Sequence, residues 1–402
     1  MISRRHVFHL GGYDPVAPET LFARFRRSLS SFQKNWNVTT TASDLTTKSD
    51  VSATWHAEAS GANWKTQTTF EILRWDDLIL QDFQRDDLSR LGHAALTLLD
   101  FVVTGTLVRY LRSSWRYTAF FLFPYCLVTL FAVLGLFVAS LTYRLFGPGG
   151  GSGALATLVA VAVFGALLRW SPWRQKINHA FDDWIFSRQF LYGQRLQMEQ
   201  RIDAFAEKIV ERARDSDADE IIVVGHCLGA ALVMQAVARA MKKDARLAEH
   251  GPKICILTVG ATIPKFSLHP RGEIGRRATA SVARNSLILW SEYHARDDMI
   301  SFYRFDPVTL THIAYDRSDG RPNIRRVQIP SMLSADSFRR SRFRFMRMHY
   351  QFLMGNDQRS AYDYCMIVCG PLPFEEITGP AGGLPHFGVD GALLASDPAQ
   401  TK

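Results

Sequence analysis

The feature that most constrains this chain is a stretch of 27 residues without a charged side chain, at positions 117–143. About 20 apolar residues cross the hydrocarbon core of a bilayer as a helix, so a stretch of this length can span it with some tilt. A buried helix of a soluble protein is the alternative interpretation, and the length argues against it. We therefore predict a transmembrane helix over residues 118–143.

A second apolar segment follows a glycine-rich turn at positions 147–153, which we do not expect to continue a helix. Residues 154–169 are short for a full span, so they form either the return arm of a hairpin or a re-entrant or interfacial helix. The positively charged residues beside this pair of segments are Arg109, Arg112 and Arg116 before it and Arg169, Arg174 and Lys176 after it. The connecting loop has only Arg144 at its edge, so the positive-inside rule predicts that both soluble parts face the cytoplasm.

Residues 95–111, before the hairpin, are apolar but contain Asp100 and Arg109, which favours an interfacial or packed helix over a third span. The predicted parts are an N-terminal part (1–94), a membrane insertion (95–187), a catalytic part (188–375) and a flexible C-terminal tail (376–402).

Composition narrows the class of protein. A hydrophobic content of 47% can build a large core, and five scattered cysteines do not form a disulfide framework, which favours a reducing compartment. The net charge of +9 is compatible with nucleic acid, but no zinc-finger, P-loop or RNA-recognition pattern accompanies it. Arginines beside apolar segments are more typical of a membrane protein, so we expect a lipid bilayer as partner and no nucleic acid. The sequence indicates no protein partner.

The soluble parts show an α/β pattern. Strands are expected at 5–10, 51–58 and 64–73, followed after the hairpin by strands at 220–224, 253–259 and 286–293. Helices are expected at 19–32, 188–214 and 228–241. This order predicts a doubly wound, mostly parallel sheet in which the transmembrane hairpin is inserted between the first strand and the central one.

The strongest catalytic motif is Gly225-His226-Cys227-Leu228-Gly229, between a β-branched strand and an alanine-rich helix. A Gly-x-nucleophile-x-Gly turn in this position holds the nucleophile above the sheet, and its glycines let strand and helix approach closely. The backbone N–H of Leu228, at the start of the helix, is suited to stabilise an oxyanion. A small buried cysteine in a tight turn is the alternative interpretation.

This motif resembles the nucleophile elbow of the α/β-hydrolase superfamily, and within it that of bacterial membrane-associated lipase-like proteins. Those relatives usually have Gly-His-Ser-x-Gly, whereas this chain has Cys227. Dienelactone hydrolases of the same superfamily use Gly-x-Cys-x-Gly, so the resemblance is compatible with a cysteine nucleophile and departs from an ordinary lipase.

The resemblance implies a triad in the order nucleophile, acid, base. The acid is expected at Asp298, with Asp297 next, in a run that leads to Asp306-Pro307. The base is expected at His349, in a segment similar to the His-Phe-Gln-Tyr-Leu-like segment of the relatives, with His386 in reserve. His226 is expected to support the turn.

The second oxyanion donor is expected from the loop His9-Leu10-Gly11-Gly12-Tyr13-Asp14-Pro15, at Gly12 or Tyr13. A simple tight turn is an equally good interpretation of this loop. No metal site is predicted, because Cys365 and Cys369 are a lone pair at helical spacing. No dinucleotide-binding pattern is present, so no cofactor is expected.

Arginines and aromatic residues alternate over positions 338–347, just before His349. This stretch suits anionic lipid headgroups, and a solvated basic face is the alternative. The leading hypothesis is a membrane-anchored esterase, lipase or thioesterase that uses a Cys-His-Asp triad on an acyl-ester or lipid substrate. The competing hypothesis is a catalytically inactive pseudo-hydrolase that serves as a membrane scaffold or binding module.

Overall fold

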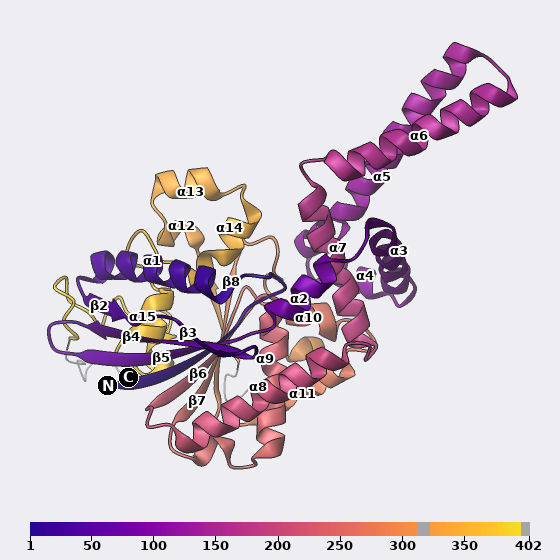
Figure 1. Ribbon diagram of the computed structural model, residues 1–402. Helices are drawn as coiled ribbons and strands as arrows, with labels where there is room; N and C mark the ends of the chain where they lie inside the picture. Colours follow the sequence, from indigo (N-terminus) through magenta and orange to yellow (C-terminus); the bar gives the residue numbers. More distant parts are fainter. Residues whose placement is uncertain (312–321, 395–402) are drawn as a thin grey trace. The chain divides into compact units, whose positions relative to one another are not determined.

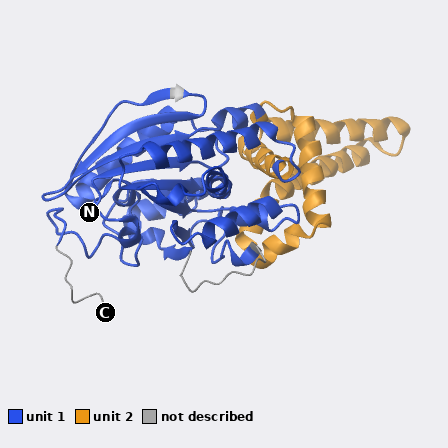
Figure 2. Ribbon diagram, turned by 90° about the horizontal axis from the view of Figure 1, so that it is seen from below, with its two compact units in different colours: residues 1–81, 190–402 blue, residues 82–189 orange. Residues whose placement is uncertain are grey.

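The computed structural model describes residues 1–311 and 322–394, and it divides the chain into two compact units (Figure 2). Unit 1 combines residues 1–81 with the chain from Phe190 onward, and unit 2 is Asp82–Gln189. The inserted unit therefore begins earlier than the predicted residue 95. The reason is that Ala94, on an early helix of the insertion, shares a core with Phe131 and Phe181 farther along the same unit.

Unit 1 contains a nine-stranded mixed sheet in the order β2-β4-β5-β1-β6-β7-β8-β9, with β3 paired to β4 (Figure 1). The strands are β1 (Arg4–Leu10), β2 (Thr39–Ala42), β3 (Thr46–Ser49), β4 (Ser52–Ser60), β5 (Lys65–Leu73), β6 (Glu220–His226), β7 (Lys253–Val259), β8 (Leu289–Ala295) and β9 (Asn323–Val327). The pairs from β5 through β1 to β9 are parallel, whereas β2, β3 and β4 pair antiparallel. The expected parallel sheet is thus extended by an antiparallel edge.

Helices cover both faces of this sheet. On one face α9 (Leu228–Lys243) packs on β6 and β1, and α8 (Leu196–Asp215) and α11 (Glu273–Arg284) flank it. On the other face lie α1 (Pro18–Trp36) and α15 (Tyr364–Cys369). The shorter helices are α2 (Asp76–Phe83), α10 (Ile263–Ser267), α12 (Ile329–Met332), α13 (Ala335–Ser341), α14 (Phe345–His349) and α16 (Phe374–Ile377), together with 3-10 turns at Leu247–Glu249, Thr309–Thr311 and Tyr350–Leu353.

The central strand β6 is buried along its whole length. Ile222 and Val224 belong to the same hydrophobic core as Phe25 and Leu29 of α1, and alternate residues of a strand point to opposite faces of the sheet. Apolar side chains are therefore needed on both faces of β6. The β-branched run at 221–224, from which the strand was predicted, satisfies this need.

The end of the described chain packs on unit 1, in contrast to the predicted flexible tail at 376–402. The ring of Phe387 lies 5.6 Å from that of Trp36 and 6.0 Å from that of Trp64. The indole N–H of Trp64 also donates to the Gly391 carbonyl at 2.9 Å. Residues 376–394 thus belong to the folded unit, and positions 395–402 of the predicted tail lie outside the described residues.

Unit 2 contains α3 (Asp87–Val103), α4 (Thr106–Ser113), α5 (Trp115–Phe146), α6 (Gly150–Trp170) and α7 (Arg174–Leu191). Helices α5 and α6 are long and apolar enough to cross a membrane. Helices α3 and α4 pass the same test only as a pair bent by 74°, over the region predicted as an interfacial helix.

The two long helices form a closely packed antiparallel pair. A Cβ atom on Gly135 would lie 2.8 Å from the carbonyl oxygen of Ala160, so the helices approach here because glycine has no side chain. Helix α6 begins at Gly150, inside the glycine-rich run that we predicted to be a turn, and it is therefore longer than the expected 154–169.

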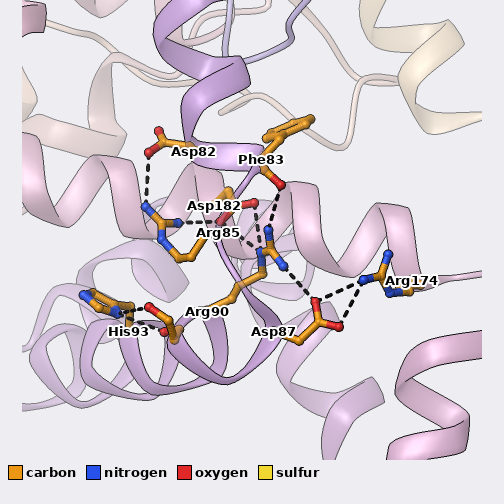
Figure 3. Close-up of polar contacts among 9 residues, drawn as sticks. Asp82, Phe83, Arg85, Asp87, Arg90, His93, Arg174 and Asp182 are labelled. Carbon is orange, nitrogen blue, oxygen red and sulfur yellow. Dashed lines mark hydrogen bonds and ion pairs between the residues drawn. The ribbon is translucent and has the colours of Figure 1, made fainter.

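Ion pairs, those of Asp182 buried, connect α3 and α7 of unit 2 (Figure 3). The Asp182 carboxylate of α7 accepts hydrogen bonds from Arg85 at 2.5 Å and from Arg90 at 3.0 Å. Asp87 pairs with both Arg90 and Arg174. Burial raises the pKa of Asp182 to about 6, and the charges of Arg90 and Arg85 oppose that rise. The guanidinium groups supply the partners that a buried carboxylate needs.

Candidate active site

Cys227 occupies a strained turn between β6 and α9. Its backbone angles are φ 56° and ψ −124°, in a region that residues with a side chain rarely adopt. Such a conformation costs on the order of 1–3 kcal/mol and is concentrated at functional sites. Cys227 is partly exposed, whereas Cys255, Cys365 and Cys369 are buried.

The two glycines of the motif permit this turn. A Cβ atom on Gly229 would lie 2.1 Å from the carbonyl oxygen of Leu10, and one on Gly225 would lie 2.6 Å from the Cα of Ala230. Contacts this short cannot exist in a folded chain, so larger residues at either position would force strand and helix apart. This is the close packing that the Gly-x-nucleophile-x-Gly pattern predicts.

Two of the expected side chains form a buried pair. His349 ends α14, and its Nδ1 lies 2.7 Å from Oδ2 of Asp298, which follows β8. Both residues are buried. The backbone N–H of Ile300 donates to the other carboxylate oxygen of Asp298 at 3.0 Å. Of the two acid candidates, the structure pairs Asp298 with the histidine, and neighbouring Asp297 is only half-buried.

The pair is electrostatically coupled. Burial by itself would lower the pKa of His349, but the charge of Asp298, the neighbouring Cys227 and the hydrogen bonds with both outweigh it and raise the pKa to about 10. Burial would likewise raise the pKa of Asp298, but the charge and hydrogen bond of His349 hold it below its usual value. The arrangement therefore favours an imidazolium beside a carboxylate.

His349 also lies close to the cysteine. A charge interaction and a side-chain hydrogen bond with Cys227 help to raise the pKa of His349, so the sulfur lies near the ring, and Nε2 of His349 is buried. A Cβ atom on Gly260 would lie 3.1 Å from the His349 ring and 3.2 Å from Asp298, so a glycine makes room for the pair. The structure thus brings Cys227, His349 and Asp298 to one end of the parallel strands.

The candidate oxyanion loop lies against the cysteine. A Cβ atom on Gly12 would be 2.6 Å from the Cβ of Cys227 and 3.1 Å from its sulfur. Tyr13 is buried and packs edge-on against Trp75. The N–H of Leu228 is the first of α9, where a helix offers no intrahelical acceptor. Gly12 thus lies against Cys227, and the role of Gly12, Tyr13 and Leu228 as oxyanion donors stays a prediction.

A contact that we did not predict joins this loop to the histidine segment. Tyr350, directly after His349, donates its hydroxyl hydrogen bond to Asp14, two residues beyond Gly12. The guanidinium of Arg24 lies 4.8 Å from the centre of the Tyr350 ring. The only sequence signal for this contact is the position of Tyr350 and Asp14 beside predicted site residues.

His226, which was expected to support the turn, contacts the histidine segment. Its Nε2 lies 3.2 Å from the carbonyl oxygen of His349, and its ring packs against those of His349 and Tyr350. Burial and the neighbouring His349 keep the pKa of His226 well below its ordinary value, so the ring is neutral. His386, the reserve base, lies beside Phe387 in the C-terminal segment, and none of its hydrogen bonds in the described chain reaches Cys227 or Asp298.

Within the described residues, no group of three or more His, Cys, Asp or Glu side chains is placed to hold a metal ion. The chain matches no protein-family model, no curated protein and no solved structure.

Proposed function

We propose that this chain is a membrane-anchored hydrolase of esters or thioesters, with Cys227 as nucleophile, His349 as base and Asp298 as its partner. The observation that carries this proposal is the coincidence of a strained, partly exposed cysteine with a buried His349–Asp298 pair at one end of the sheet. Strained backbone and a shifted histidine pKa at the same place are typical of catalytic sites.

In the proposed reaction His349 takes the proton of the Cys227 thiol, and the sulfur attacks the carbonyl carbon of the substrate to form a tetrahedral intermediate. The negative oxygen of this intermediate accepts hydrogen bonds from the N–H of Leu228 and from Gly12 or Tyr13. When the intermediate collapses, the bond to the leaving group breaks and His349 gives that group a proton. The product is an acyl thioester on Cys227.

Water completes the cycle. His349 takes a proton from a water molecule, whose oxygen attacks the acyl carbon, and the carbon–sulfur bond then breaks to release the acid. Asp298 holds the imidazole in the orientation that exposes Nε2 and stabilises the imidazolium. Each step uses only the substrate, water and these side chains.

The order of the elements supports an α/β-hydrolase-like fold as part of the proposal. The cysteine turn follows β6, the central parallel strand, the acid follows β8, and the histidine comes last in the chain. The Gly11–Gly12 loop follows β1, which pairs with β6, so it lies beside the nucleophile. This is the order of nucleophile, acid and base used by that superfamily.

The helices α5 and α6 support a membrane location. We propose that they cross the bacterial inner membrane as a hairpin with both soluble parts in the cytoplasm. The reason is that arginines precede α5 and follow α6, whereas the loop between the two helices has only Arg144 at its edge. Reporter fusions at residue 50 and at the C-terminus should both report the cytoplasm. Reporters on opposite sides would contradict the hairpin.

The competing proposal is a pseudo-hydrolase that serves as a scaffold, in which Cys227 only packs. Substitution of Cys227 separates the two. Cys227→Ala should abolish hydrolysis of a thioester such as an acyl-coenzyme A or a soluble nitrophenyl ester by purified, detergent-solubilised protein, while leaving the unfolding temperature unchanged. The alanine keeps the backbone of the turn but offers no atom for attack.

Cys227→Ser sharpens this test. A hydroxyl ionises far less readily than a thiol, so a site that depends on a thiolate should lose most of its rate, whereas a site with His349 as general base should keep part of it. A matched control is Cys126→Ala, a cysteine of α5 outside the site. Full activity of both Cys227→Ala and His349→Ala would contradict the catalytic assignment, and the absence of hydrolysis by the wild-type protein would favour the scaffold.

A further inference from the structure

A cavity of about 700 Å³ lies beside β8 and β9 in unit 1. It is larger than a water pocket and falls within the range of small-molecule sites. Its apolar wall includes Phe305, Met332 and Tyr362, which are buried. Three arginines complete the lining, Arg304, Arg325 and Arg326. The cavity does not include Cys227, His349 or Asp298.

Two polar groups face the same space in this cavity. Tyr293 of β8 and Arg325 of β9 are direct partners in the parallel register, so their side chains leave the sheet on the same face. The Tyr293 hydroxyl is buried and has no hydrogen-bond partner in the described chain. Burial raises the pKa of Tyr293, and the charge of Arg325 opposes that rise, which places the guanidinium near the hydroxyl.

Positive charge in the cavity exceeds negative charge. The Nε of Arg325 donates to the Thr378 carbonyl at 3.1 Å, which fixes the guanidinium and leaves its outer nitrogens without an ion pair in the described chain. Arg304 and Arg326 likewise form no ion pair with the described residues. Among the described residues of the lining, Asp306 is the one acidic residue, and its carboxylate accepts the N–H of Val308. The buried Tyr293 hydroxyl has no partner in the described chain and lies beside Arg325, which is held in place. A bound ligand is therefore expected to supply the hydrogen-bond acceptor.

We propose that this cavity binds a small organic anion, whose carboxylate or phosphate accepts hydrogen bonds from Arg325 and Tyr293 and whose apolar body lies against Phe305 and Tyr362. Arg304 supplies further positive charge at the rim. This site is separate from the Cys227 site, so it stands whether or not the chain is a hydrolase.

Phenyl phosphate is a suitable probe, because it joins a phosphate to an aromatic ring. The full chain in lipid nanodiscs is titrated with phenyl phosphate, and binding is followed by calorimetry. Inorganic phosphate lacks the apolar body and benzyl alcohol lacks the charge, so both should bind at least about tenfold more weakly. Equal binding of benzyl alcohol, or no binding of phenyl phosphate, would overturn the proposal.

Two substitutions locate the binding. Arg325→Gln should weaken phenyl phosphate binding by at least about tenfold, because it removes a charge-assisted hydrogen bond. Arg277→Gln is the matched control, since it removes an exposed arginine of α11 outside the cavity and should leave binding unchanged. Equal losses in the two variants would show nonspecific attraction to a basic protein and contradict the site.

Tyr293→Phe distinguishes a role of the Tyr293 hydroxyl in ligand binding from a role in the stability of the fold. Removing a buried hydroxyl without a partner should maintain or raise the unfolding temperature of the free protein. The same change should weaken phenyl phosphate binding several-fold, because the anion loses a donor. A variant that is less stable yet binds normally would show that the hydroxyl serves the fold and not the ligand.

Discussion

Nδ1 of His349 lies 2.7 Å from Oδ2 of Asp298, although 50 residues separate the two in the chain. The aspartate holds the ring in one orientation and favours its protonated form. Both the chemistry proposed for Cys227 and the pH dependence of the fold follow from this pair.

The pair should make stability depend on pH. The folded pKa of His349 is about 10, above the unfolded value of about 6.5, so its contribution is complete below pH 6.5 and is lost as the pH rises through 10. The lowered pKa of Asp298 adds a contribution that is present above about pH 4 and lost below it. The difference in unfolding temperature between wild type and His349→Gln should therefore shrink between pH 7 and pH 10. A difference that stays constant over this range would contradict the ion pair.

Gly12 should tolerate no side chain. In Gly12→Ala the new methyl group would lie 2.6 Å from the Cβ of Cys227, so the loop must move away from the nucleophile. We expect turnover to fall by about 100-fold or more, the size of effect known for loss of one oxyanion donor. Gly11→Ala is the matched control, because its methyl group would meet no atom within 4 Å. Equal activity of the two variants would contradict the placement of the oxyanion loop at Gly12.

The basic and aromatic stretch before His349 should bind anionic lipid. Phe343 is 74% exposed, and exposed arginines surround it, namely Arg339, Arg340, Arg342 and Arg344. Replacing these four with Gln should weaken activity on substrates in anionic vesicles by roughly 1 kcal/mol per charge. Activity on a soluble ester is the internal control and should change little. Equal losses on both substrates would indicate a structural role for the stretch.

Asp182 should be essential for the stability of unit 2. Asp182→Ala leaves the buried guanidinium of Arg90 without this partner, and breaking a buried ion pair costs about 3–5 kcal/mol. Asp87→Ala is the control, because the Asp87 side chain is 42% exposed and an exposed pair contributes at most about 1 kcal/mol. Thermal unfolding in detergent should show a much larger loss for Asp182→Ala. Similar losses of stability would mean that the buried ion pair contributes no more to stability than the exposed one.

The sequence alone was sufficient for features that depend on neighbouring residues. The apolar stretch at 117–143 predicted α5, because spanning a bilayer needs only length and hydrophobicity. The turn at Cys227 was equally local, since a β-branched strand, two glycines and an alanine-rich helix adjoin one another in the chain. The central strand and the helix at 228–241 were recognised for the same reason, whereas the helix expected at 188–214 is divided between α7, which ends at Leu191, and α8, which begins at Leu196.

Tertiary structure decided what depends on contacts between distant residues. The choice of Asp298 over Asp297, the Tyr350–Asp14 hydrogen bond and the start of unit 2 at Asp82 all depend on packing across many intervening residues. The packing of 376–394 on Trp36 and Trp64 had no local signal, because glycine and proline in that segment are as typical of a loose tail as of a packed loop. The Tyr293–Arg325 pairing that underlies the anion cavity likewise depends on which strands are neighbours, and neighbouring strands are set by the assembled sheet.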